Sequence, residues 1–402
     1  MVKHLTLGAA LAAAAVMPAA AGAGSPAQER ADPRLNEIQV IGTHNSYAIP
    51  ADARAMALMA PQLAALYAAM TQQLPEDRRA ALAEEHPAGI SDPAISLDYV
   101  QMPLEAQLRM GVRSIELDLH PDPAGGLYAD PLPYRQLRAQ GVRDLAPIYT
   151  DALRQPGMKV LHVADLDFRS QCPAFRDCLS LMRRWSDANP AHSPVFVLLE
   201  PKSSALGRVV EGAAMVPPFD ASAFEEVDAS IRDILGPGRI FTPDQLRGDH
   251  ATLEQAALAR AWPKLSQMRG KFVFLYLVPG LNLQTFAPYM QDRPSLQGRA
   301  AFVQGLPGMA HTAFVLVDNA LTRPERIPEL VRAGYIVRSR ADIDTDEARR
   351  NDPDRRDRTL ASGAQVISTD YLAAPNVHGN RYHVAPFQGG WRCNPVIGKC
   401  RR

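Results

Sequence analysis

Short runs of apolar and β-branched residues recur along the chain and predict its strands. Most of the runs are nearly continuous in apolar residues, which is typical of strands buried on both faces of a parallel sheet. Segments with helical periodicity precede several of them, such as 104–111 and 175–190. The runs that we expect to form strands are 37–42, 112–119, 159–166, 194–201, 271–279, 313–319, 334–340 and 364–370.

The alternation of strands and helices predicts an α/β fold, namely a (β/α)8 barrel of the TIM type. A doubly wound open sheet is the alternative, but the Gly-rich turn that usually follows its first strand is missing. The sequence has no internal repeat and no low-complexity linker. We therefore expect one catalytic domain over residues 24–402.

Two regions lie outside this alternation. Residues 50–93 are rich in good helix formers and predict a helical insertion between the first two strands. We expect these helices to pack against the barrel, and a lid over the active face is the alternative. Residues 373–402 are rich in Gly, Pro and Asn and predict a C-terminal loop that a disulfide closes.

The N-terminus has the pattern of a secretory signal peptide. Lys3 precedes a short, Ala-rich apolar run, and small residues with an Ala-x-Ala cleavage pattern follow up to residue 23. We therefore expect export to the periplasm or the medium. An even number of cysteines in an exported chain indicates disulfides, and proximity favours Cys172–Cys178 and Cys393–Cys400 among three connectivities.

Composition and charge argue against some partners. The 402 residues carry 43 basic and 43 acidic side chains, so the chain has no net charge that would attract nucleic acid. Apolar residues make up 47% of the chain, which is enough for a packed core. After the N-terminus no apolar run is as long as a membrane span, so we expect no transmembrane segment. Nothing in the sequence indicates the oligomeric state.

Polar and ionisable side chains follow several of the predicted strands. In a barrel of this type the carboxyl ends of the strands form the active face, so these side chains are expected to converge. Glu116 and Asp118 are two residues apart on one strand and share one face of it. With Asn45 and Glu200 they form an all-oxygen set, which suits calcium or magnesium better than zinc.

Two histidines lie beside this set. His44 directly precedes Asn45, and His162 lies in the third predicted strand. Two imidazoles on either side of a reacting centre can move protons to and from oxygen near neutral pH. His120 and His162 are interchangeable in this role on the sequence pattern alone.

Four stretches carry a similarity to a known family: GTHNSY at 42–47, LEAQLRMGVRSIELDLH at 104–120, CLSLMRRWSDANPAHSPVFVLLEPK at 178–202 and GYIVRSRADIDTDEARRNDPDRRDRTLASGAQVISTDY at 334–371. The chain resembles the calcium-dependent phosphoinositide-specific phospholipase C family, and more narrowly its secreted bacterial and fungal branch. The resemblance covers nearly the whole chain after the signal peptide, apart from the helical insertion before Pro93. It implies a barrel enzyme that cleaves a phosphodiester on the glycerol side of the phosphate.

The resemblance also implies a mechanism and a site. The inositol 2-hydroxyl would attack phosphorus with acid–base help from histidine, and diacylglycerol would leave from an inositol phospholipid at a membrane surface. Ca2+ is the cation that the resemblance implies, although Mg2+ suits the same ligands. The residues with expected roles are His44 and His162 for catalysis, Asn45, Glu116, Asp118 and Glu200 for the cation, and Lys202 and Arg338 for the substrate.

Two other functions are consistent with the same motifs. A glycerophosphodiester phosphodiesterase, acting on soluble diesters, is another barrel with a first-strand His, a Glu-x-Asp pair and a second His. A secreted barrel that binds lipid or carbohydrate without catalysis is the second alternative. An inactive relative is expected to have lost a candidate site residue, and all are present. The long stretch 334–371 favours phospholipase C.

Overall fold

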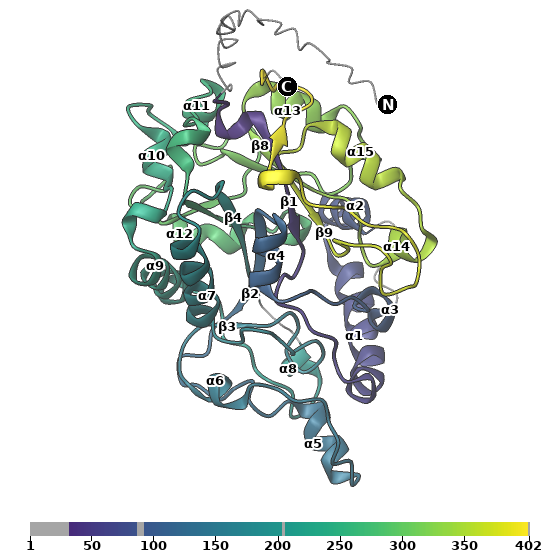
Figure 1. Ribbon diagram of the computed structural model, residues 1–402. Helices are drawn as coiled ribbons and strands as arrows, with labels where there is room; N and C mark the ends of the chain where they lie inside the picture. The colour runs from purple at the N-terminus through teal and green to yellow at the C-terminus, as the bar shows by residue number, and fades with distance from the viewer. Residues whose placement is uncertain (1–31, 87–91, 203–205, 401–402) are drawn as a thin grey trace, which may run out of the picture.

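A barrel of parallel strands forms the centre of the computed structural model, which describes residues 32–86, 92–202 and 206–400 (Figure 1). Neighbouring strands follow the order β6-β5-β4-β2-β1-β9-β8-β7, and a parallel bridge between Gln304 and Phe314 links the two ends. The predicted α/β barrel of the TIM type is confirmed. Its strands are β1 Ile38–Thr43, β2 Ser114–His120, β4 Val195–Pro201, β5 Phe272–Tyr276, β6 Ala301–Val303, β7 Phe314–Leu316, β8 Ile336–Arg340 and β9 Val366–Thr369.

One predicted strand is wrong, and one barrel strand was not predicted. The run 159–166 contributes only β3, Lys159–Val160, which pairs antiparallel with the end of β2 and is not part of the barrel. The backbone of Asp165 has a φ of 61°, so the chain turns where a continuous strand was expected. The remaining barrel strand is β6. Its apolar run, 300–303, is shorter than the run 313–317 around the equally short β7, and two of its four residues are alanines, which are not typical of strands.

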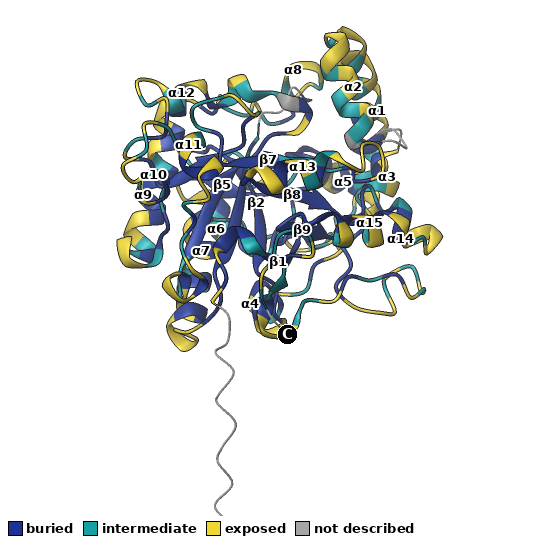
Figure 2. Cartoon of the chain, turned by 90° about the horizontal axis from the view of Figure 1, so that it is seen from above, coloured by how far each residue is buried: buried dark blue, intermediate teal, exposed yellow. Residues whose placement is uncertain are grey.

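The barrel strands are covered on both faces, as their continuous apolar runs predict. Every residue of β1 and of β2 is buried (Figure 2). Gly42 of β1 pairs with Ser114 of β2, and a Cβ at position 42 would lie 2.3 Å from the Cβ of Ser114. Glycine therefore lets the two strands approach each other just before the chain turns out of the barrel.

Helices surround the barrel and bury one face against it. In α7, for example, Phe175, Leu179 and Met182 are buried at helical spacing. Within the described residues, no helix is both long and apolar enough to cross a bilayer. After the insertion the helices are α4 Leu104–Met110, α5 Leu132–Ala139, α6 Thr150–Arg154, α7 Phe175–Ala188, α8 Leu206–Val209, α9 Ala221–Leu235, α10 Pro243–Arg247, α11 Leu253–Leu258, α12 Ala287–Met290, α13 Arg326–Ala333, α14 Asp346–Arg350 and α15 Asp354–Ser362.

The region 50–93, expected to be helical, contains α1 Ala53–Gln73 and α2 Glu76–Glu85 and ends at the first residue of α3 Pro93–Ser96. The side chain of Asp52 caps α1 by accepting a hydrogen bond from the backbone N–H of Arg54. These helices stand together at one side of the barrel (Figure 1). The predicted signal peptide, residues 1–23, lies outside the described residues.

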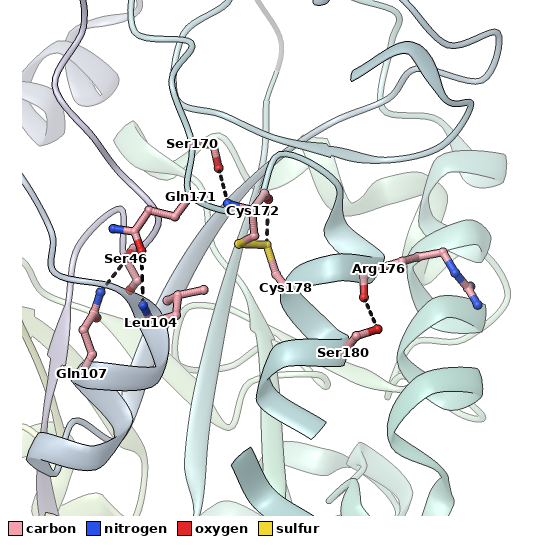
Figure 3. The surroundings of a disulfide bond; sticks show 9 residues. All are labelled: Ser46, Leu104, Gln107, Ser170, Gln171, Cys172, Arg176, Cys178 and Ser180. Carbon is pink, nitrogen blue, oxygen red and sulfur yellow. Dashed lines mark hydrogen bonds between the residues drawn. A yellow bond between two sulfur atoms is a disulfide. The ribbon is translucent and has the colours of Figure 1, made fainter. Parts of the chain in front are cut away.

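Both predicted disulfides are confirmed. Cys172–Cys178 joins the chain before α7 to the first turn of that helix (Figure 3). Cys393–Cys400 closes the C-terminal segment. This segment, expected to be a loop, contains one short strand, β10 Arg392–Cys393, which pairs antiparallel with the beginning of β1.

Candidate active site

A cavity of about 370 Å³ lies at the carboxyl ends of the barrel strands. His44 follows β1, Glu200 lies near the end of β4, Arg340 ends β8 and Asp370 follows β9. His162 reaches the same cavity from the segment after β3. Side chains from distant parts of the chain therefore line one space, as the topology of a barrel allows.

Three carboxylates form a cluster at this end of the barrel. Glu116, Asp118 and Glu200 each have an oxygen within 4.8 Å of the others. The pairing of β2 with β4 places Asp118 opposite Glu200, and Glu116 lies on the same face of β2 two residues earlier. Glu116 and Asp118 are buried, so their charges repel strongly unless a cation or a proton lies between them.

Two basic side chains contact the carboxylate cluster. Nζ of Lys202 lies 2.8 Å from Oδ2 of Asp118 and 2.7 Å from Oε1 of Glu200. Nη2 of Arg338 lies 2.9 Å from Oε2 of Glu116. Three carboxylates against two cations leave the cluster with a net negative charge, which is suited to a further cation.

The residues of the cluster fit a hard divalent cation. Asp118 is buried, and its Oδ1 has no hydrogen-bond partner among the described residues. Burial raises the pKa of the Asp118 carboxyl to about 7, against the attraction of Lys202. A buried oxygen of this kind is costly to leave without a partner. Carboxylate and amide oxygens are the ligands that Ca2+ takes in proteins.

Asn45 lies in the turn that leaves β1, with a φ of 40°. Its Oδ1 accepts a hydrogen bond from the hydroxyl of Tyr47, and its Nδ2 donates one to the hydroxyl of Tyr99. The backbone N–H of Ser46 donates to the carbonyl of Glu116, and the N–H of Glu116 donates to Oγ of Ser46. The turn that carries Asn45 is therefore tied to the strand that carries the carboxylates.

Gln107 of α4 supports the same turn, although no motif in the sequence points to it. Its Nε2 donates to the carbonyl of Ser46 at 2.7 Å (Figure 3), and its Oε1 accepts from the hydroxyl of Thr43 at 2.6 Å. The signal that was available is a glutamine among the apolar, inward-facing residues of α4, because buried amides are retained where the backbone needs partners.

The two candidate histidines face each other across the cavity. Their ring centroids are 6.3 Å apart and the rings are nearly perpendicular, at 82°. Nδ1 of His44 lies 3.1 Å from Oδ1 of Asp370, and Nδ1 of His162 lies 3.0 Å from Oδ2 of Asp167. Each imidazole thus has its Nδ1 beside a carboxylate. Nε2 of His44 lies 3.8 Å from Oε1 of Glu116, which is beyond hydrogen-bond distance.

The surroundings of His44 favour its neutral form. Burial lowers the pKa of His44 well below its usual value, and the nearby guanidinium of Arg340 lowers it further. Nη2 of Arg340 lies 3.3 Å from Nδ1 of His44 and 3.6 Å from Oδ2 of Asp370. Burial raises the pKa of Asp370 to about 7, although Arg340 acts against this rise. Asp167, Asp370 and Arg340 were in the polar clusters of the sequence, but no role was assigned to them.

His120 also lines the cavity. The sequence pattern alone did not distinguish its role from that of His162. It is buried against the ring of Tyr128, and its Nδ1 has no hydrogen-bond partner among the described residues. Burial lowers its pKa well below the usual value. In the part of the chain that the structure describes, no carboxylate pairs with His120 as Asp167 does with His162, and the ring that faces His44 is that of His162.

The two expected substrate-binding residues lie in different surroundings. Lys202 lines the cavity while it contacts the carboxylates of Asp118 and Glu200. Arg338 is buried between Glu116 and Asp318, in an ion pair with each, and does not line the cavity. Its assignment to the substrate stays a prediction. Of the two arginines of β8, Arg340 is the one that lines the cavity.

The family described as phosphoinositide phospholipase C, Ca2+-dependent, has a sequence model that matches residues 33–395. The chain belongs to this family. It is therefore a phosphodiester hydrolase of the phospholipase C type, and its family depends on Ca2+. Membership of this family confirms the expectation of an enzyme with a Ca2+ requirement.

Two solved bacterial structures are similar to this phospholipase C over most of their length. A Ca2+-dependent phosphatidylinositol-specific phospholipase C from Streptomyces antibioticus has 18% sequence identity over 84% of this chain and 94% of that chain, with a TM-score of 0.47. A calcium-dependent phosphoinositol-specific phospholipase C from a Gram-negative Pseudomonas species has 15% identity over 88% and 95% of the two chains, with a TM-score of 0.47. No curated protein matches the chain.

The helical insertion lines the outer part of the cavity in this phospholipase C. Side chains of α1 and α2 reach it from one side, and α3 contributes Pro93 and Ser96. The same helices also pack against the rest of the protein, since Met59 and Leu63 of α1 join an apolar cluster with Leu132. The insertion is thus both packed against its neighbours and part of the wall of the cavity.

Proposed function

We propose that the protein is a phosphatidylinositol-specific phospholipase C that cleaves the bond between phosphorus and the glycerol oxygen. The observation that carries this proposal is the pair His44 and His162, which face each other in the cavity beside a cluster of three carboxylates. A substrate with an internal hydroxyl nucleophile needs one group to take a proton and one to give a proton on opposite sides of phosphorus.

In the proposed reaction the inositol 2-hydroxyl attacks phosphorus and its proton passes to Nε2 of His44. In the tautomer whose Nδ1 donates to Asp370, Nε2 of His44 is the nitrogen that accepts this proton, and it lies 3.8 Å from Oε1 of Glu116. The bond from phosphorus to the glycerol oxygen breaks, and Nε2–H of His162 donates a proton to the departing oxygen. The products are diacylglycerol and a cyclic inositol 1,2-phosphate, so atoms and protons balance.

The remaining site residues position the substrate and its charge. Arg340 lies beside His44 and lines the cavity, so its guanidinium would bind the phosphoryl oxygens, and Lys202 would supply a second positive charge. Glu116, Asp118, Glu200 and Asn45 would hold Ca2+. When bound, the cation would lower the pKa of the attacking hydroxyl and offset negative charge on the phosphoryl group.

The test compares His44→Ala and His162→Ala with His383→Ala, a histidine outside the cavity. Cleavage of phosphatidylinositol with Ca2+ is followed by 31P NMR, which separates the cyclic phosphate from other products. We expect each cavity variant to lose at least 100-fold in kcat, since acid–base help is commonly worth about 10²–10⁴. The control should keep the wild-type rate, and all three should keep the wild-type melting temperature.

Two results would contradict the proposed reaction. A near-normal rate for His44→Ala would show that His44 does not act as the base. Faster hydrolysis of glycerophosphoinositol than of phosphatidylinositol, without a cyclic product, would instead support the glycerophosphodiester phosphodiesterase. A substrate that lacks the inositol 2-hydroxyl should not be cleaved by the proposed route.

We also propose that the enzyme acts after export, at the surface of a membrane that contains inositol phospholipid. The signal-peptide pattern at 1–23 and the two disulfides support this location. The N-terminal sequence of the mature protein from the periplasm or the medium should begin just after residue 23. A cytosolic protein that retains Met1 would contradict it.

A further inference from the structure

One face of α1 lines the cavity with apolar side chains. Leu63, Leu66, Tyr67 and Met70 recur at the spacing of a single helical face, Leu74 follows as the residue that caps the end of the helix, and all five line the cavity. From Leu63 to the last residue of α1, Gln73, the helix is about 15 Å long, given a rise of about 1.5 Å per residue. Exposure increases along this face, from 4% at Leu63 to 44% at Met70. We call these five residues the α1 face.

The α1 face is more than a surface that packs against the protein interior. At its beginning Leu63 is buried in an apolar cluster, but Leu66, Tyr67 and Leu74 are only partly buried. These later residues face the open cavity, together with Leu82 of α2. Apolar side chains that stay partly exposed in a cavity gain free energy when an apolar ligand covers them.

The polar side chains that the insertion contributes to the cavity include two that already have partners. Nε of Arg78 donates to the carbonyl of Gly280 at 3.4 Å. Nδ1 of His86 lies 2.7 Å from Oδ2 of Asp344. A ligand along the α1 face therefore meets mainly hydrocarbon, whereas a ligand at the base of the cavity meets histidine, arginine and carboxylate.

The α1 face is held in place at both ends of the insertion. At the beginning of α1, Asp52 accepts a hydrogen bond from the backbone N–H of Ala146, and Arg54 pairs with Asp144. At the end of α2, Glu84 pairs with Arg323. A wall fixed at both ends provides a preformed apolar surface, which lowers the cost of ordering it on binding.

We propose that the α1 face binds the first methylenes of the substrate's acyl chains and so selects lipids over deacylated diesters. The proposal rests on the reaction proposed above, because that reaction places the phosphate at the base of the cavity and the diacylglycerol half outward. The amphiphilic cavity matches such a substrate: its charged end meets the headgroup, and its apolar side meets the chains.

The test measures kcat/KM with monomeric substrates of increasing chain length. Glycerophosphoinositol and phosphatidylinositols with two butanoyl, hexanoyl or octanoyl chains are used below their critical micelle concentrations. A fully buried methylene contributes about 0.8 kcal/mol, or about fourfold in kcat/KM, so we expect wild-type kcat/KM to rise about two- to fourfold per buried methylene.

The variants are Met70→Ser and Leu66→Ser, with Met110→Ser as a matched control. Met110 lies in α4, outside the cavity, and is 43% exposed, against 44% for Met70. We expect the chain-length dependence of kcat/KM to fall at least by half in the two cavity variants and to stay at the wild-type value in the control. Melting temperatures check that each variant folds, and Met70→Ser carries little risk because the side chain is largely exposed.

The outcomes distinguish a failure of the α1 proposal from a failure of the proposed reaction. If the wild type makes cyclic phosphate from every phosphatidylinositol with a flat chain-length dependence, the α1 proposal is wrong and the reaction stands. The α1 proposal is equally wrong if Met70→Ser and Leu66→Ser keep the wild-type dependence. If the wild type cleaves only glycerophosphoinositol, both proposals fail.

Discussion

The charges around His44 suit the role of a base. Arg340 lies beside His44, and a neighbouring cation disfavours a protonated imidazole. Burial acts in the same direction, and together they outweigh the attraction of Glu116, so the pKa of His44 lies well below its usual value. A neutral His44 is ready to accept a proton, which supports the role that we propose for it. His162, whose Nδ1 lies beside Asp167, is the remaining partner for the role of the acid.

At the scale of single residues, the buried His192 is expected to make the free energy of unfolding depend on pH. Its Nδ1 donates to the carbonyl of Ser193, its Nε2 accepts from the hydroxyl of Ser186, and the ring packs on Trp185. Burial lowers its pKa from 6.5 to about 4. The unfolded chain therefore binds the proton more readily. The contribution of neutral His192 to the free energy of unfolding is fully present above pH 6.5. Up to about 3 kcal/mol of it is lost as the pH falls toward 4.

The measurement is urea unfolding of the wild type and His192→Gln between pH 7.5 and pH 4.5. The variant removes the titrating group, so its free energy of unfolding should decline less with acidity than that of the wild type. Parallel pH profiles for the two proteins would show that His192 does not contribute in this way. His383→Gln, at a surface position, provides the control and should follow the wild type.

At the scale of elements, the disulfide Cys172–Cys178 anchors the segment between β3 and α7, which carries His162 and Asp167 (Figure 3). The backbone N–H of Gln171 donates to the carbonyl of Tyr47, so this segment is also tied to the chain after β1. The two histidines thus face each other partly because irregular segments, and not only strands, are held at fixed positions.

Replacing each cystine by two alanines tests what the disulfides contribute to stability. The bridged residues are six positions apart in Cys172–Cys178 and seven in Cys393–Cys400, and loops of this size predict a loss of about 2 kcal/mol for each. Cys178 is fully buried in the core, whereas the other pair is partly exposed, so removing Cys172–Cys178 should cost more. Urea unfolding gives both values, and the reverse order would contradict this account.

At the scale of the whole molecule, the fold brings acidic side chains together although acidic and basic residues are equal in number along the chain. The chain has no net charge, yet Glu116, Asp118 and Glu200 meet at one end of the strands. Repulsion among them is part of the free energy of folding, and it is relieved when a divalent cation binds the folded protein but not the unfolded chain.

Calcium should therefore raise the melting temperature of the protein. At a Ca2+ concentration 100 times the dissociation constant the stabilisation is about 2.7 kcal/mol. Glu200→Gln should lose most of this shift, and Glu105→Gln, an exposed acid on α4, should keep it. Differential scanning calorimetry with Ca2+ and with a chelator measures the shift, and chelation should also abolish activity. An equal shift in Glu200→Gln would contradict the role of the carboxylate cluster.

Much of the barrel could be predicted because its strands are buried on both faces and so have continuous apolar runs. The prediction was wrong where this pattern was misleading. Residues 159–166 are apolar enough for a strand, but the chain turns at Asp165. The apolar run that contains β6 is short and half alanine, so it was not recognised as a strand. Gly42, Glu116, Asp118 and Glu200 were recognisable as residues at strand ends. Arg340 and Arg338 were not separable, because both lie on one strand and on the same face.

The sequence by itself indicated the barrel and the family, favoured the disulfide pairs among three connectivities, and determined the residue types at the carboxyl ends of the strands, because periodicity and motifs are local properties. Only the tertiary structure decided which side chains meet. It places Asp370 beside His44 and Asp167 beside His162, buries Arg338 beneath the site, and turns the α1 face toward the cavity. Such contacts depend on strand register and on loop paths between residues far apart in the chain, which no local pattern specifies.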